Sequence, residues 1–281
     1  MIKKISKAEP NISTERLCTL MEGPISCYYY KPVINQRDID ITERLTQFHT
    51  DNFMCYGKRR MQVELEKHGI KIGIYKVSSL IKKAGIQAKV PKKRHQYKTD
   101  EVRPDIPNLL NRQFNETELN THWCSDITYI RTVKGWSYLA TILDLANKEI
   151  VGYATSESAD TGLVINALAS SISTCKPDMN KLIFHSDQGT QYKSRKLRTY
   201  LKNRGITQSM SRRGNCWDNA VQERFFRNIQ FEYLDDLIFM NHQAVEVAVG
   251  RYIRYYNYSR INSAIGYMTP LQKRRELLKV G

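Results

Sequence analysis

The chain has 281 residues, which is enough for one large domain or two modest domains, each with its own hydrophobic core. Its formal net charge is +16, because 44 Lys and Arg residues outnumber 28 Asp and Glu residues, and this excess predicts a polyanionic partner. No apolar stretch approaches the roughly 18 residues that a membrane-spanning helix requires, and no apolar signal core follows Met1. We therefore expect a cytoplasmic, nucleoid-associated protein without membrane contact. A basic protein with no specific partner is the alternative.

The cysteines are scattered and form no Cys-x-x-Cys pair. This spacing favours reduced thiols over a disulfide framework, and it predicts no zinc ribbon or finger. The cysteines are Cys18, Cys27, Cys55, Cys124, Cys175 and Cys216.

Residues 1–89 are predicted to be helical and basic. Apolar side chains recur at helical spacing in residues 37–51, again from Tyr56 onward, and from Ile74 to a stop at Gly85. Two short helices joined by a glycine-containing turn predict a helix-turn-helix that binds DNA. A helical arm with a solvated basic face is the alternative. The predicted DNA contacts are Arg59, Arg60, Lys76, Lys82 and Lys83.

Residues 90–119 are predicted to form a basic linker. A dense run of positive charge follows Pro91, and prolines interrupt the segment after it. Such a linker can follow a nucleic-acid backbone, although many lysine-rich linkers are merely solvated. The predicted DNA contacts here are Lys92, Lys93 and Arg94.

Residues 120–281 are predicted to form an α/β domain with a helical, basic tail. Apolar runs and turn residues predict a mixed five-stranded sheet with flanking helices. The predicted strands are 123–131, 136–143, 150–155, 182–184 and 206–210. The predicted helices are 163–172, 196–201 and a long helix that Asp218 caps and that runs to about Tyr233. The tail interleaves tyrosines with arginines, and we expect those rings to pack against the domain and leave a basic edge.

Asp126, Asp187 and Glu223 are the chemically informative acids. Asp126 and Asp187 interrupt or end strand-like runs, and Glu223 opens a helix-like run. Burying an acid in such places is costly unless something positive pairs with it. If the two strands are neighbours, the carboxylates converge at one edge of the sheet. Carboxylate oxygens suit magnesium, and two such ions drive phosphodiester chemistry.

Spacing alone leaves rival acids. Asp144 is interpreted as closing its strand before the turn at Asn147, and Asp218 as the helix cap. Glu232 follows Glu223 by nine residues, so it points to a different face of the helix.

The residues around the three acids resemble a known family. Trp123-x-x-Asp126-Ile127-Thr128-Tyr129 and His185-Ser186-Asp187-Gln188-Gly189-x-Gln191-Tyr192 resemble the integrase-like core of DDE transposases and retroviral integrases. Gly214-Asn215-Cys216-Trp217-Asp218-Asn219-Ala220, with Glu223 and Phe225-Phe226, is similar to the insertion-sequence-three family and to its OrfB-type product. Tyr56-Gly57-x-Arg59-Arg60 and Tyr252-Ile253-x-x-Tyr256-Asn257-x-x-Arg260 extend the resemblance over nearly the whole chain.

This resemblance implies a ribonuclease H-like fold in which Asp126, Asp187 and Glu223 are the catalytic, metal-binding triad. It implies two Mg²⁺ ions, with Mn²⁺ able to substitute. It further implies a bacterial transposase that cleaves DNA at element ends and transfers the strand to target DNA, through a figure-eight and a circle. Expected partners are DNA, further copies of the chain on DNA, and the upstream-frame product or a fusion with it. Since residues 1–35 contain no leucine heptads, weak binding by the chain alone is expected.

The residues near the triad indicate further roles. His185 and Gln188 flank Asp187 and are predicted to orient water or phosphate in the second shell. The remaining predicted DNA contacts are Arg212, Arg213 and Arg227.

Two residues depart from the family pattern. Gln230 stands where relatives carry Lys or Arg, and Asn262 where many carry His. These changes are compatible with a catalytically decayed copy acting only as a DNA-binding protein. A ribonuclease H-type nuclease is a further alternative, because it would share the core, but it does not explain the N-terminal basic helices.

Overall fold

A computed structural model of the chain describes residues 5–6, 11–30, 35–91, 106–111, 117–211 and 219–280. The chain forms two compact units, residues 1–44 and 45–281. The first unit contains α2 (Thr14–Leu20) and α3 (Ile25–Tyr29), and Ser13 caps α2 by accepting a hydrogen bond from the backbone of Arg16. The division into 1–89, 90–119 and 120–281 stays a prediction.

The helices predicted in the N-terminal third are confirmed. They are α4 (Gln36–Asp51), which runs from the first unit into the second, α5 (Lys58–Lys67) and α6 (Ile74–Lys83). Helices α5 and α6 pack together, with Met61 and Leu65 buried on one and Val77 and Leu80 on the other. Gly85 ends this segment in the left-handed region, at φ +66°, which glycine adopts without steric cost.

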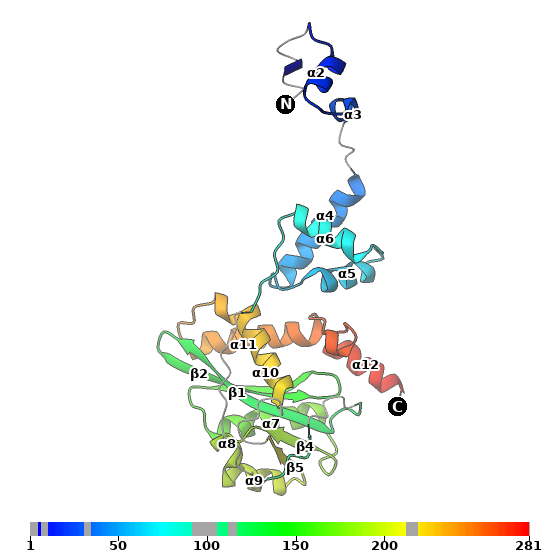
Figure 1. Ribbon diagram of the computed structural model, residues 1–281. Helices are drawn as coiled ribbons and strands as arrows, with labels where there is room; N and C mark the ends of the chain where they lie inside the picture. The colour runs from blue at the N-terminus through cyan, green and yellow to red at the C-terminus, as the bar shows by residue number, and fades with distance from the viewer. Residues whose placement is uncertain are drawn as a thin grey trace. The chain divides into compact units, whose positions relative to one another are not determined.

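The mixed five-stranded sheet is also confirmed. Its order is β3-β2-β1-β4-β5, with β1 antiparallel to β2 and parallel to β4 (Figure 1). The first two strands each extend one residue beyond both predicted ends. The strands are β1 (His122–Thr132), β2 (Gly135–Asp144), β3 (Ile150–Ser156), β4 (Ile183–Ser186) and β5 (Thr207–Met210).

Helices cover both faces of the sheet. The core on one face joins the sheet to α10 and α11, and the core on the other face joins it to α7 and α9. Neighbouring β1 residues enter opposite cores, Trp123 the second and Cys124 the first, as the pleat of a strand requires. These helices are α7 (Thr161–Cys175), α8 (Thr190–Lys193), α9 (Arg195–Lys202), α10 (Ala220–Glu232), α11 (His242–Tyr258) and α12 (Pro270–Val280), with 3-10 turns η2 (Leu234–Asp236) and η3 (Ser263–Ile265).

The start of α10 leaves the prediction for Asp218 as a cap untested. The residue at the N-cap position is Asn219, whereas Asp218, the predicted cap, lies outside the described residues. Asn219 makes no side-chain capping bond to its own helix. Its amide donates instead to the carbonyl of Ser125 in β1, at 3.3 Å, so it joins the helix to the sheet.

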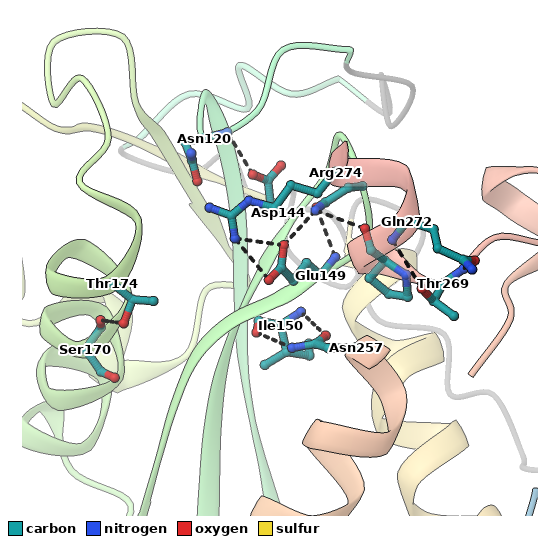
Figure 2. Close-up of polar contacts among 12 residues, drawn as sticks. Asn120, Asp144, Glu149, Ile150, Ser170, Thr174, Asn257, Thr269, Gln272 and Arg274 are labelled. Atoms are coloured by element: carbon teal, nitrogen blue, oxygen red, sulfur yellow. Dashed lines mark hydrogen bonds and ion pairs between the residues drawn. The ribbon is translucent and has the colours of Figure 1, made fainter. Parts of the chain in front are cut away.

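The C-terminal helices are fixed to the edge of the sheet by paired polar contacts (Figure 2). Asn257 of α11 exchanges two hydrogen bonds with the backbone of Ile150, at 3.0 and 2.9 Å. Arg274 of α12 pairs with the buried carboxylate of Glu149 at 3.3 Å. Asp144 closes β2 as predicted, because its carboxylate accepts from the backbone N–H groups of Asn120 and Ala146.

A buried ion pair joins α10 to the tail. The guanidinium of Arg260 makes three hydrogen bonds with the carboxylate of Glu232, the shortest at 2.6 Å, and both side chains are at most 3% exposed. Tyr252 donates its hydroxyl proton to the same carboxylate, at 2.7 Å. Glu232 therefore has a structural partner away from Glu223, as predicted.

Most of the tyrosines of α11 pack inward, as predicted, and Tyr258 is exposed. Tyr252 and Tyr256 are buried, and Tyr255 donates a hydrogen bond to Asn52 at 2.9 Å. The hydroxyl of Tyr56 accepts from the backbone of Ile261 at 2.8 Å. Segments about 200 residues apart in sequence therefore meet in one cluster.

The described cysteines carry free thiols, as predicted, namely Cys18, Cys55, Cys124 and Cys175. Within the ranges that the structure describes, no helix has both the length and the apolar character that crossing a membrane requires.

Replacing Glu232 with Gln is expected to destabilise the second compact unit. The substitution leaves the guanidinium of Arg260 buried without a counter-charge, which typically costs about 3–5 kcal/mol. Urea unfolding followed by far-ultraviolet circular dichroism measures the change. The control is Glu246→Gln on the exposed side of α11. Equal unfolding midpoints for the two variants would contradict a stabilising role for the pair.

Candidate active site

Parallel pairing of β1 with β4 brings the first two predicted acids together. The register pairs Cys124 with His185 and Ser125 with Ser186. Asp126 and Asp187 are the next residues on their strands. Asp126 lies where β4 ends and β1 continues, opposite Thr141 of β2. The two carboxylates therefore start from equivalent positions on adjacent strands, as the sequence predicted for neighbouring strands.

The negative charges of Asp187 and Glu223 both act on Asp126. The pKa of the Asp126 carboxyl is raised to about 8, first by burial and then by the negative charges of Asp187 and Glu223, against a lowering by the backbone N–H of Ile127. Within the described residues, no Lys or Arg acts on Asp126 to offset these effects. Among the described residues, the charged form of Asp126 is stabilised by the backbone N–H of Ile127 and by no positive side chain, an environment that suits an added cation.

Asp187 lies in the turn directly after β4. Burial raises the pKa of its carboxyl, while the backbone N–H of Gly189 and the charge of Lys193 lower it. The N–H of Gly189 donates to this carboxylate at 2.9 Å. A Cβ at position 189 would lie 3.1 Å from the same oxygen, so glycine permits this close approach.

Glu223 is exposed in the first turn of α10. Hydrogen bonds across α10 and the sheet fix the position of this turn. Gln222 is fully buried and donates through its amide to the hydroxyl and to the backbone carbonyl of Thr141, the residue opposite Asp126. The side chain of Asn219 reaches Ser125, the residue before Asp126. These contacts hold Glu223 where its charge acts on Asp126.

Asp126, Asp187 and Glu223 have the ligand chemistry of a site for a hard cation. All three side chains are carboxylates, which suit Mg²⁺ or Mn²⁺, whereas imidazole and thiolate would select softer metals. In the described part of the chain, no group of three or more His, Cys, Asp or Glu side chains is gathered so as to hold one ion. The three acids therefore interact electrostatically without forming a closed cage.

His185 has a different environment from the one predicted. It is only 1% exposed, and its ring nitrogens lie 2.9 Å from the hydroxyl of Ser209 and 3.1 Å from that of Ser211. A ring held on both sides joins β4 to β5, and the role of His185 in orienting water or phosphate stays a prediction. Gln188 donates to the carbonyl of Ser211 at 3.0 Å, so it fixes the same turn.

Gln230 also has an internal partner. Its amide donates to the hydroxyl of Thr128 in β1, at 3.2 Å. The residue thus anchors α10 to the strand that carries Asp126. Arg227 is exposed one turn after Glu223, where it adds a positive charge beside that face.

The predicted DNA contacts fall into two groups. In α5 and α6, Arg59, Lys76, Lys82 and Lys83 are exposed, while Arg60 is half-buried over the ring of Tyr56. Lys92, Lys93, Arg94, Arg212 and Arg213 lie outside the described residues.

Sequence reasoning missed several contacts around the acids. Gln222 and Asn219 stand in the motif that contains Glu223, but polar residues at a helix start give no sign of which strand they bind. The hydroxyl groups of Ser125 and Tyr192 form a buried hydrogen bond, at 2.9 Å, beneath Asp126. Lys193 was missed as a charge beside Asp187, since its short helix was not predicted.

Comparison with known proteins agrees with this architecture. Two models described as integrase core domain match residues 116–216 and 204–270, and a model described as HTH-like domain matches residues 36–94. The chain thus combines an HTH-like region with an integrase core that follows it in the sequence.

Full-length relatives define the family. The chain is 34% identical to "Putative transposase InsK for insertion sequence element IS150" of Escherichia coli (strain K12), over 93% of both chains. It is 32% identical to "Transposase InsF for insertion sequence IS3A" of the same strain, over 95% of this chain and 96% of the relative. The HTLV-2 integrase catalytic core domain in complex with magnesium shows a TM-score of 0.43 at 16% identity, over 55% of this chain and 95% of that one. The chain belongs to the insertion-sequence-three family of transposases, as an OrfB-type member.

Replacing Gln230 with Lys is expected to strengthen DNA binding. The new ammonium group would lie on the helix face of Glu223 and add about one phosphate contact, so the slope of log K against log salt should steepen by about 1. Fluorescence anisotropy with duplex DNA across a salt series measures this slope. Gln230→Met is the control, because it loses the bond to Thr128 without adding charge. An unchanged slope in the Lys variant would show that no phosphate reaches this face.

Proposed function

We propose that this transposase cleaves DNA at the ends of its element and joins the freed ends to target DNA, using Asp126, Asp187 and Glu223 to hold divalent metal ions. One observation supports this proposal above the others. The pKa of Asp126 is raised by burial and by both other acids, and no described Lys or Arg compensates its charge. A protein that only binds DNA has no use for such an arrangement.

Each residue has a part in this proposal. Asp126 and Asp187, side by side on β1 and β4, would hold an ion between them. Glu223 would complete the site from the first turn of α10. Bound Mg²⁺ ions would make the attacking oxygen more nucleophilic and stabilise the leaving oxygen of an in-line displacement at phosphorus.

Cleavage and strand transfer are two successive displacements at phosphorus. In cleavage, a water oxygen bonds to phosphorus, the bond to the 3′-oxygen breaks, and a 3′-hydroxyl and a 5′-phosphate result. In strand transfer, that 3′-hydroxyl loses its proton and attacks a phosphorus in the target. The 3′-oxygen of the target strand leaves, so the number of phosphodiester bonds is conserved.

The basic elements would supply the DNA-binding surface. Arg59, Lys76, Lys82 and Lys83 are exposed on α5 and α6, within the segment that matches the HTH-like model. We assign sequence-independent phosphate contacts to these residues and to Arg227. The basic linker and the loop with Arg212 and Arg213 belong to the same proposal from sequence alone.

Asp187→Asn is expected to reduce magnesium-dependent joining by on the order of 10⁴-fold, the scale of losing a central catalytic group. A labelled duplex carrying the cognate element end, a target plasmid and the full chain with its upstream-frame product form the assay. Asp235→Asn, on an exposed 3-10 turn, is the matched control and should retain activity.

The same assay separates the remaining alternatives. Joining by the wild type but not by Asp187→Asn supports the transposase. DNA binding without cleavage by the wild type would indicate a catalytically decayed copy. In the sequence, this alternative is supported by Gln230. Cleavage of RNA–DNA hybrids without joining would indicate a ribonuclease H-type nuclease. Full joining by Asp187→Asn would overturn the assignment of the triad.

A further inference from the structure

A second site lies on α10, around the helix axis from Glu223. A hollow of about 210 Å³ opens beside Arg224, Phe225 and Asn228. Arg224 is the residue after Glu223, so it is rotated from it by about 100°. The hollow therefore adjoins the proposed active site through one helix, yet it shares none of the three acids.

The polar groups of this hollow are available for a ligand. Arg224 is exposed and has no ion pair among the described residues, and Asn228, one turn later, has no hydrogen-bond partner among them. None of the lining residues is acidic. A guanidinium and an unused amide, without a carboxylate, favour a ligand with negative charge and a hydrogen-bonding edge.

The floor of the hollow is part of the hydrophobic core. Phe225 and Tyr256 meet edge to face, with ring centroids 4.9 Å apart, and both side chains are buried. The side chain of Asn262 is hydrogen-bonded to Tyr256 and also accepts from the backbone of Ala264 at 3.0 Å, so this wall is fixed. Lys148 lies at the opposite side, and its ammonium donates to the carbonyl of Leu145 at 2.5 Å. The stem of Lys148, more than its charge, therefore lines the hollow.

Size and chemistry together select the ligand. The volume is below the roughly 300–1,000 Å³ of sites for drug-sized molecules, so one planar ring system fits better than a larger group. Asn side chains bind the edges of bases, and arginines bind phosphates. A nucleotide whose base lies outside the double helix combines a planar ring, a hydrogen-bonding edge and a negatively charged phosphate.

We propose that this hollow receives an unpaired base of the DNA end during cleavage, with Asn228 on the edge of the base and Arg224 on its phosphate. This inference rests on the proposed function, because it takes the DNA end as the ligand. Extruding a base opens the duplex next to the phosphate that is cut, which gives Glu223 and the two aspartates access to it. The hollow is then a subsite that selects the base beside the cut.

Photocrosslinking tests the proposal. Duplexes from the DNA that flanks the gene carry 5-iodo-deoxyuridine at successive positions around the cut, and the full chain is used as its Asp187→Asn variant. That background removes the chemistry and keeps the fold, so the result does not depend on whether strand transfer succeeds. The expected crosslink maps by mass spectrometry to residues 220–228 or 256–264, at one position only.

Variants of the lining establish the contacts. Asn228→Leu and Arg224→Ala are each expected to lower the yield of that crosslink by about tenfold, the effect of losing one good base or phosphate contact. Arg254→Ala removes the same charge from an exposed position on α11 and is the matched control. Circular dichroism checks that each variant is folded.

The outcomes separate the two proposals. Crosslinks that map elsewhere, or that survive in Asn228→Leu, overturn the base subsite even if joining is observed. A specific crosslink that requires Asn228 supports the subsite even if the wild type proves unable to join DNA. A loss of crosslinking in Arg254→Ala as large as in Arg224→Ala would show a general effect of charge and would also overturn the subsite.

Discussion

The parallel pairing of β1 with β4 is the constraint on which the candidate active site depends. Each strand carries its acid one residue beyond the last registered pair, so a shift of the register by one residue would turn one acid to the opposite face of the sheet. The register itself is held by contacts that no acid makes, including His185 between two serines and the hydroxyl pair of Ser125 and Tyr192. The buried polar groups beneath the site thus stabilise an arrangement of like charges that would otherwise repel.

Helix α10 carries Glu223 on one face and lines the hollow with another. Hydrogen bonds to the sheet hold the helix in place. The amides of Gln222 and Gln230 bond to β2 and β1, so the helix is fixed at both ends of the face that carries Glu223. Gln230, which the resemblance marks as a departure from the family pattern, has an internal hydrogen bond to Thr128. The other face carries the hollow with Arg224 and Asn228. A rigid attachment of α10 therefore sets the position of the acid and of the hollow together.

Most elements were predictable because local patterns determine them. Apolar runs and turn residues located all five strands, and the glycines at 69, 73 and 85 marked the ends of α5 and α6. Asp126 and Asp187 were predictable because each interrupts a strand. The contacts of Gln222, Arg260 and His185 were not, since each joins residues far apart in sequence, and a polar residue in a helix or strand does not reveal its partner. The bond from the amide of Asn219 to β1 was not predictable for the same reason.

The cluster that joins the tail to the N-terminal third has a consequence for how such a gene loses function. Lys89 pairs with Asp236 and donates to the carbonyl of Glu232, Tyr56 accepts from Ile261, and Asn52 accepts from Tyr255. A premature stop codon after residue 240 would leave every proposed metal ligand in the product. It would nevertheless remove the residues that cover Phe53 and Tyr56. Such a truncated protein would lose the packing of its DNA-binding third while keeping its acids, so a gene can look catalytically intact and still encode a protein that does not fold.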